Sequence, residues 1–136
     1  MPPPKVLEEK KIPYASCPGV SSFCGAASSL NLEYTLPEVS QSLVITRMAG
    51  RTPVPQKESI ESFAAHQASM AVFLSAGMLG ELRKRLLAGG YKENTPAAIV
   101  YKATWEDEIK ITCSLGELEE KAKERGIKKT ALILVG

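Results

Sequence analysis

The chain has 136 residues, 44% hydrophobic and 24% charged, which suits one folded domain with a real core and excludes a largely disordered protein. Its net charge is only +2, and the densest basic run, residues 121–129, also contains Glu124, which favours a solvated helix face over a nucleic-acid surface. Three cysteines without CxxC spacing indicate free thiols of a cytoplasmic protein rather than a disulfide framework or a zinc site, and no apolar run is long enough to cross a bilayer.

The first elements suggest that the sequence begins inside a longer protein. Met1 is followed by three prolines and then by a charged run, which is unlike a signal peptide. Residues 5–11 are typical of the last turns of a helix and residues 12–17 of a short strand, and a native fold rarely begins in the middle of such a unit. We therefore expect residues 1–17 to be the tail end of a preceding domain or a linker. Residues 18–136 are expected to form a C-terminal α/β domain, with the N-terminal domain absent.

Helical and strand periodicities then alternate along the chain. Helices are expected at residues 21–30, 55–67, 78–88 and 116–125. Strands are expected at residues 42–47, 69–75, 97–103, 109–113 and 130–135. The fourth strand follows a turn at residues 106–108 and should be antiparallel to the third. This order predicts an α/β fold with a mixed, mostly parallel sheet and helices on both faces.

The loops that follow strands are the first places to search for a site, since ligands of open α/β sheets bind beyond the carboxyl ends of strands. In residues 18–22 (PGVSS), a Pro-Gly turn sets Ser21 and Ser22 at a helix N-terminus, where N–H groups and the helix dipole favour an anionic group. A plain turn with an N-cap serine explains the same residues. Small residues also end the strands near Ser75 and Ala103. They would let a flat ligand approach the backbone, but they equally suit tight turns.

Two arginines, Arg47 and Arg51, flank Gly50 in a loop bounded by prolines. Guanidinium forks suit carboxylates and phosphates, although a surface ion-pair loop would have the same composition. The single histidine, His66, has no nucleophile or carboxylate set around it and is interpreted as structural or surface. The sequence contains no catalytic-triad or metal-ligand spacing and no Walker or GxGxxG loop, so the catalytic residues stay unknown and no bound metal is expected.

Four segments together resemble one protein family: residues 18–55 (PGVSSFCGAASSLNLEYTLPEVSQSLVITRMAGRTPVP), 64–77 (AAHQASMAVFLSAG), 97–108 (AAIVYKATWEDE) and 128–136 (KKTALILVG). They are similar to the C-terminal portion of the tetrapyrrole (corrin/porphyrin) methylases. The RMAGRTPVP and YKATWEDE parts resemble in particular the precorrin-4 and cobalt-precorrin-4 methyltransferases of cobalamin biosynthesis, whereas PGVSS is shared by the wider family. The resemblance covers nearly the whole chain from Ile12 onward.

This resemblance implies a homodimeric, two-domain enzyme that binds S-adenosylmethionine between its domains. It implies transfer of the methyl group to carbon 11 of a tetrapyrrole substrate with many carboxylates, without a metal and with S-adenosylhomocysteine as product. The cofactor-binding positions that match the family are Ser21, Ser22, Leu74, Ser75, Ala103, Thr104, Thr130 and Ala131. Arg47 and Arg51 become candidate partners for the substrate carboxylates.

One departure from the family concerns the cofactor site. The family's N-terminal domain carries a Gly-rich loop with a Gly-Asp pair that completes this site, and the sequence contains no Gly-Asp dipeptide. We therefore expect a fragment with little methyltransferase activity alone. Two alternatives stay open: a non-catalytic dimerisation or binding module with the same fold, and a tetrapyrrole methylase that acts at another ring position. Whether the substrate carries cobalt is also open.

Overall fold

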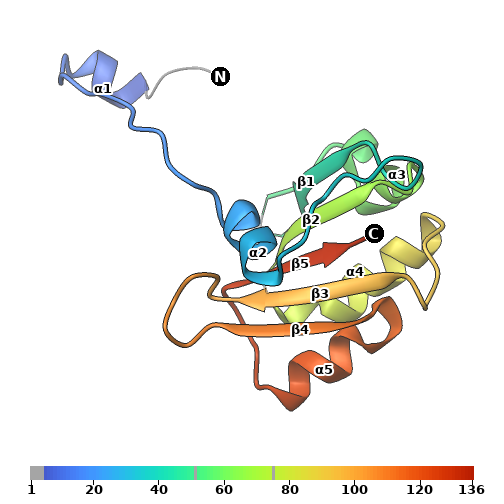
Figure 1. The fold of residues 1–136 in the computed structure, drawn as a ribbon. Coiled ribbons are helices and arrows are strands. Elements are labelled where there is room, and N and C mark those ends of the chain that lie inside the picture. The colour runs from blue at the N-terminus through green and yellow to red at the C-terminus, as the bar shows by residue number, and fades with distance from the viewer. Residues whose placement is uncertain (1–4, 51, 75) are drawn as a thin grey trace.

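A computed structural model describes residues 5–50, 52–74 and 76–136, and in these residues a five-stranded sheet carries helices on both faces (Figure 1). The strands are β1 (Leu43–Arg47), β2 (Ser69–Leu74), β3 (Pro96–Tyr101), β4 (Ile109–Ser114) and β5 (Ala131–Val135). The α-helices are α1 (Lys5–Glu9), α2 (Ser22–Leu30), α3 (Ile60–Ala64), α4 (Leu79–Ala88) and α5 (Leu118–Glu124). Short 3₁₀ helices precede α3, α4 and α5 at Gln56–Glu58, Ala76–Met78 and Leu115–Glu117. None of the helices in the described ranges is both long enough and apolar enough to cross a bilayer.

The strand order of the sheet is β1-β2-β5-β3-β4, and β1–β2 is its parallel pair, while β2–β5, β5–β3 and β3–β4 are antiparallel. The mixed α/β fold with helices on both faces is confirmed, but the expectation of a mostly parallel sheet is wrong. The physical reason is the hairpin between β3 and β4, which reverses the chain. Helix α5 then returns the chain to the edge where β4 began. β5 therefore runs opposite to β2 and β3, and it lies between these two strands.

Residues 12–17 do not form the expected strand. They belong to an extended segment between α1 and α2, residues 10–21, which is exposed throughout (Figure 1). A strand needs a neighbour that satisfies its backbone N–H and C=O groups, and this segment pairs with none of the described strands. The expected helix at residues 5–11 is confirmed as α1, at the far end of the same segment.

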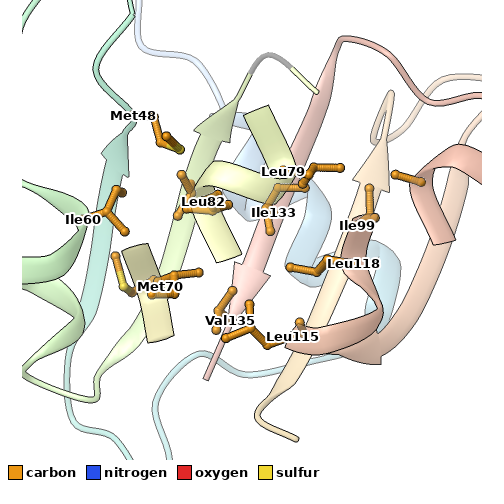
Figure 2. Packing of buried hydrophobic residues seen from close by; sticks show 14 of the residues in the cluster. Met48, Ile60, Met70, Leu79, Leu82, Ile99, Leu115, Leu118, Ile133 and Val135 are labelled. Atoms are coloured by element: carbon orange, nitrogen blue, oxygen red, sulfur yellow. The ribbon is translucent and has the colours of Figure 1, made fainter. Parts of the chain in front are cut away.

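The larger part of the core lies between the sheet and helices α3, α4 and α5 (Figure 2). Successive side chains of a strand point to opposite faces, and on this face β2 presents Met70 and β5 presents Ile133. Leu82 and Leu86 of α4 pack against them, and all four side chains have no exposed surface. Each such burial contributes about 1.5–3 kcal/mol, so this layer supplies most of the stabilisation.

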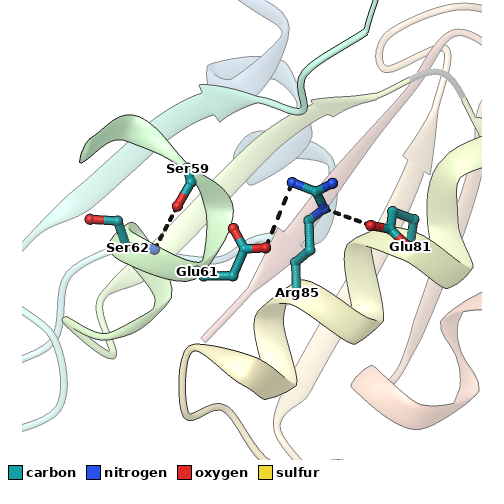
Figure 3. A network of polar contacts seen from close by, with 5 residues as sticks. All are labelled: Ser59, Glu61, Ser62, Glu81 and Arg85. Carbon is teal, nitrogen blue, oxygen red and sulfur yellow. Dashed lines mark hydrogen bonds and ion pairs between the residues drawn. The ribbon is translucent and has the colours of Figure 1, made fainter. Parts of the chain in front are cut away.

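The helix expected at residues 55–67 is divided into a 3₁₀ helix and α3. Ser59 causes the division because it is the N-cap of α3, and its hydroxyl accepts a hydrogen bond from the Ser62 N–H at 3.1 Å (Figure 3). Arg85 of α4 links α4 to α3. Its guanidinium lies 2.8 Å from the Glu81 carboxylate of α4 and 3.6 Å from the Glu61 carboxylate of α3 (Figure 3). Ion pairs as exposed as these contribute at most about 1 kcal/mol. The α3–α4 contact therefore depends mainly on close packing.

Part of the opposite face of the sheet is covered by α2, which lies directly on the strands (Figure 1). Small buried residues permit this approach: Ala26 on the helix, with Ala71 and Ala98 on the strands. Gly25 faces the loop after β3, where an added Cβ would lie 3.4 Å from the Thr104 methyl group. The N-terminal half of α2 is thereby held against the end of β3.

We expect Gly89→Ala to destabilise the domain by about 1–3 kcal/mol, the usual cost of overpacking. Gly89 ends α4 at φ −81°, so any residue can adopt its backbone conformation. An added Cβ, however, would overlap the Cβ of Ala64 and lie 2.7 Å from the Glu61 carbonyl oxygen of α3. Urea denaturation measures the change. Gly77→Ala is the matched control, since its Cβ would meet nothing within 4 Å. Equal stability of the two variants would contradict the packing argument.

Candidate functional site

At one edge of the sheet the ends of all five described strands lie together, including the start of β4, where Ile109 pairs with Tyr101. β1, β2 and β3 end there and β5 begins there, because Ala131 pairs with Leu74 on one side and with Tyr101 on the other, and Arg47 pairs with Phe73. The loops beyond this edge and the N-terminus of α2 enclose a cavity of about 530 Å³. This volume lies within the range of small-molecule sites, about 300–1,000 Å³.

Residues predicted from the sequence meet in this cavity. It is lined by Ser22, Arg47, Ala103, Thr130 and Ala131. These residues come from α2, from the ends of β1 and β3, and from the start of β5. The fold therefore brings together positions that are up to 109 residues apart in the sequence, from Ser22 to Ala131.

The other predicted residues lie beside the cavity or outside the described part of the chain. Ser21 is the N-cap of α2, with φ −74° and ψ 152°, and its side chain makes no capping hydrogen bond. Thr104 is exposed and borders a shallower hollow next to the cavity. Arg51 and Ser75 lie outside the described residues, and so does the side chain of Leu74.

Sequence reasoning missed other lining residues, among them Phe73, Met78, Lys102 and Trp105. Lys102 and Trp105 belong to the YKATWEDE segment, and the alternation of cation and aromatic ring there was the available signal. Phe73 was expected in a strand buried on both faces, yet its side chain is 40% exposed. The reason is that α2 covers only part of the sheet face on which Phe73 lies.

Strained backbone is concentrated at this edge. Lys102, Thr104 and Thr130 have φ values of 48°, 71° and 60°, in the left-handed region. A β-branched residue rarely adopts such a conformation, which costs on the order of 1–3 kcal/mol. The Lys102 N–H donates to the Thr130 carbonyl at 3.1 Å, so the turn after β3 and the turn before β5 hold each other. Strain of this kind clusters at ligand-binding and catalytic sites.

Among the described residues, two cationic side chains line the cavity. Nη1 of Arg47 donates to two carbonyls of its own loop at 3.2 and 3.4 Å, which fixes that loop against the end of β1. The Lys102 ammonium forms an ion pair with Asp107 and lies 5.3 Å from the centre of the Trp105 ring. The hydrogen bond to Asp107 raises the pKa of Lys102, so its charge persists at neutral pH. Such side chains suit a flat ligand that carries negative groups.

Groups with catalytic or metal-binding chemistry are scarce near the cavity. Within residues 5–50, 52–74 and 76–136, no three His, Cys, Asp or Glu side chains are grouped so that they could hold a metal ion. His66 is exposed and borders a hollow with Ser42 and Ala68, next to the starts of β1 and β2 and so at the other end of the sheet, which confirms its surface position. The described residues that line the cavity can bind a ligand through hydrogen bonds, positive charge and complementary shape.

The sequence and the fold both match known proteins. A family model described as Tetrapyrrole (Corrin/Porphyrin) Methylases matches residues 5–119. A cobalt-precorrin-4 C(11)-methyltransferase of Methanocaldococcus jannaschii is 53% identical over 119 residues, which are 88% of this chain and 46% of that protein. The solved structure of a cobalt precorrin-4 methyltransferase superposes with a TM-score of 0.92 and 36% identity, over 97% of this chain and 55% of that one.

A more distant structure has the same fold. A uroporphyrin-III C-methyltransferase of Thermus thermophilus, solved in complex with S-adenyl homocysteine, superposes with a TM-score of 0.71 at 21% identity, over 96% of this chain and 55% of that one. At this identity the likeness concerns the fold alone. The chain spans about half the length of the relatives that it matches.

We expect Thr130→Asn to raise the melting temperature by about 4 °C, which corresponds to about 1 kcal/mol of relieved strain. Asn adopts a positive φ more readily than Thr does, and Thr130 is exposed, so the exchange disturbs no core contact. Circular dichroism during heating measures the shift. Thr112→Asn, on the exposed face of β4, is the control and should lower the melting temperature slightly. A destabilised Thr130→Asn variant would show that Thr130 is not strained.

Proposed function

The chain belongs to the tetrapyrrole (corrin/porphyrin) methylase family, and we propose that it is the C-terminal part of an S-adenosylmethionine-dependent methyltransferase of cobalamin biosynthesis. The proposed reaction is methylation of cobalt-precorrin-4 or precorrin-4 at carbon 11. The observation that carries the proposal is the cavity at the sheet edge. It unites five residues, from α2, β1, β3 and the start of β5, that the family resemblance assigns to the cofactor or the substrate.

The described wall of the cavity fits an adenosyl cofactor in character. Ser22, Ala103 and Ala131 are small, so a bound molecule can approach the backbone of three different elements. Val100 and Leu132 are almost fully buried and give the cavity an apolar floor suited to a purine ring. Ser22 lies at the N-terminus of α2, where a carboxylate such as that of the methionine part is favoured. The remaining positions proposed to hold the cofactor are Ser21, Leu74, Ser75, Thr104 and Thr130.

The proposed chemistry makes modest demands on catalytic side chains. S-adenosylmethionine supplies a methyl group bound to a positively charged sulfur. When bound, it would supply this methyl by in-line displacement: the electron pair of a nucleophilic substrate carbon would form the new carbon–carbon bond as the carbon–sulfur bond breaks, and the pair of the broken bond would stay on sulfur. The protein contributes binding, orientation and electrostatics, of which orientation alone can supply about 7–11 kcal/mol. Rigid strand ends and interlocked turns suit this task.

The charged rim of the cavity supports a substrate with many carboxylates. We propose that Arg47 binds one of them, together with Arg51, which lies outside the described residues. Lys102 adds a cation that the sequence did not predict. Trp105 is 63% exposed beside it and offers a flat surface on which a macrocycle could stack.

We propose that a preceding domain supplies the opposite wall of the site, with residues 1–17 as its tail end or as a linker. The chain spans about half the length of its relatives, which is consistent with this arrangement. Ile12, Tyr14 and Val20 support it, because their apolar side chains are 47%, 44% and 87% exposed on the extended segment before α2. Large apolar side chains exposed along one segment are typical of a surface that another part of a protein covers. A homodimer and a cytoplasmic location are further predictions of the family resemblance.

We expect the chain alone not to bind S-adenosylhomocysteine with micromolar affinity, because it contributes one wall of the site. Fused behind the N-terminal half of the Methanocaldococcus jannaschii relative, it should gain at least about 100-fold in affinity, a difference of ~2.7 kcal/mol. Isothermal titration calorimetry of both proteins measures this. Micromolar binding by the chain alone would contradict the need for a second wall. A correctly folded fusion that binds nothing would instead support a non-catalytic module.

In the same fusion protein, Arg47→Met should raise KM for the tetrapyrrole by about 10- to 100-fold. This factor corresponds to the loss of one hydrogen bond to a charged group, which contributes ~1.5–3 kcal/mol. Its affinity for S-adenosylhomocysteine should change little, since Arg47 is proposed to contact the substrate. Arg47→Lys separates charge from fork geometry and should give an intermediate KM. Lys84→Met removes an exposed cation from α4, away from the cavity, and is the control. A KM unchanged in Arg47→Met would remove Arg47 from the substrate site.

A further inference from the structure

Glu108 joins two elements that are far apart in the sequence. Its Oε1 accepts a hydrogen bond from the hydroxyl of Ser29 in α2 at 2.5 Å, and its Oε2 accepts one from the N–H of Thr104 in the β3–β4 turn at 2.6 Å. Lys110 strengthens the junction, because its ammonium donates to the Ser29 carbonyl at 2.9 Å and lies 3.9 Å from Oε1. One carboxylate thus ties α2 to the turn that follows β3.

The turn that Glu108 holds is a strained one. Thr104 has a φ of 71°, and its N–H points at the carboxylate rather than into a strand ladder. The Thr104 methyl group and the Ala103 Cβ meet α2 at Gly25, where the helix has no side chain to keep the turn away. A hydrogen bond to an ionised carboxylate is about twice as strong as a neutral one. It can therefore offset part of the cost of the left-handed conformation.

The two elements that Glu108 joins form two sides of the cavity. α2 contributes Ser22, and the β3–β4 turn contributes Lys102, Ala103 and Trp105. Glu108 itself does not line the cavity. We propose that Glu108 is a positioning residue: it holds the C-terminal end of α2, at Ser29, against the β3–β4 turn, and through the helix it sets the position of Ser22 and thereby the shape of the cofactor site. This inference rests on the proposed function, since it assigns the cofactor to that cavity.

The charge of Glu108 supports the same role. The hydrogen bonds from Ser29 and from the Thr104 backbone, and to a smaller degree the charge of Lys110, lower the pKa of the Glu108 carboxyl. Lys110 is the charged group that faces it among the described residues, since α2 presents only the Ser29 hydroxyl and carbonyl and the turn presents a backbone N–H. A lowered pKa in the folded state means that the stabilisation is complete above the unfolded pKa, about 4.3. It is lost as the pH falls through the folded pKa.

The first test measures the junction itself in the 136-residue chain. In Glu108→Ala, amide exchange at Thr104 should accelerate by at least about 10-fold, the equivalent of one lost hydrogen bond. The NMR shifts of Ser22 and Ala103 should move together. Glu106→Ala removes the same charge two residues earlier, where the side chain is exposed, and should change neither. Unchanged exchange and shifts in Glu108→Ala would overturn the proposal.

The second test measures binding in the fusion protein, because the chain alone contributes one wall of the site, and S-adenosylhomocysteine titrated up to millimolar concentration is the NMR probe. Glu108→Ala should weaken the affinity by about 10-fold, while Glu106→Ala should match the unaltered fusion protein. Glu108→Gln keeps an acceptor for Thr104 and can still bond to the Ser29 hydroxyl, so it should restore most of the affinity. If Glu108→Ala fails to fold, Ser29→Ala removes one of the two bonds and should give a smaller loss. Equal affinities of Glu108→Ala and Glu106→Ala would refute the positioning role.

The outcomes distinguish this inference from the proposed function. If the unaltered fusion protein shows no shifts at Ser22 and Ala103 with millimolar S-adenosylhomocysteine, the proposed cofactor site fails. Whether Glu108 joins α2 to the β3–β4 turn is then judged only from the first test, which measures the amide exchange rate of Thr104 and the coupled NMR shifts of Ser22 and Ala103. Acid unfolding adds a check, since the difference in melting temperature between Glu108→Ala and the unaltered chain should be full at pH 7 and should shrink below about pH 4. A difference that does not depend on pH would show that the ionised carboxylate is not what joins the elements.

Discussion

The rest of the domain depends on β5, because this strand pairs with β2 on one side and with β3 on the other and has no exposed residue. Its side chains serve both layers: Ile133 and Val135 join the core under α3, α4 and α5, and Leu132 and Leu134 face α2. Without β5, the β1–β2 pair and the β3–β4 hairpin would be separate two-stranded units. Such units are marginal in water. The strand nearest the C-terminus therefore unites the two halves of the sheet.

The insertion of β5 between β2 and β3 also forms the cavity. β5 enters the sheet at the edge where β2 and β3 end, so Ala131 and Thr130 lie between the carboxyl ends of two strands that come much earlier in the chain. The left-handed conformation of Thr130 costs about 1–3 kcal/mol. Burial of an apolar side chain such as Ile133 or Leu132 contributes about 1.5–3 kcal/mol each, so the strand that follows can hold the strained turn in place. The rigidity of the edge thus comes from the core.

The strands of this sheet could be predicted from the sequence because runs such as residues 69–75 and 130–135 are continuously apolar, a pattern that is local. Strand order could not, since the insertion of β5 between β2 and β3 is decided by contacts across most of the chain. The strand expected at residues 12–17 has the right composition but no neighbour to pair with. In the site, small residues such as Ala103 were found through the family resemblance rather than through their chemistry. Lys102, Trp105 and Glu108 were missed because their roles depend on a left-handed turn, which periodicity does not reveal.

Under the proposed function, different parts of the fold bind the cofactor and the substrate. Val100 and Leu132 form the floor of the cavity, and small side chains on α2, after β3 and at the start of β5 form its inner wall. The core fixes the strands, and Glu108 is proposed to fix α2 against the turn. The charged and aromatic side chains of the cavity lie at the end of β1 and in the β3–β4 turn: Arg47, Lys102 and Trp105. Under the proposed function, a methyl donor on the inner wall is combined with a substrate that the end of β1 and the β3–β4 turn select, and the RMAGRTPVP and YKATWEDE segments contain these two loops.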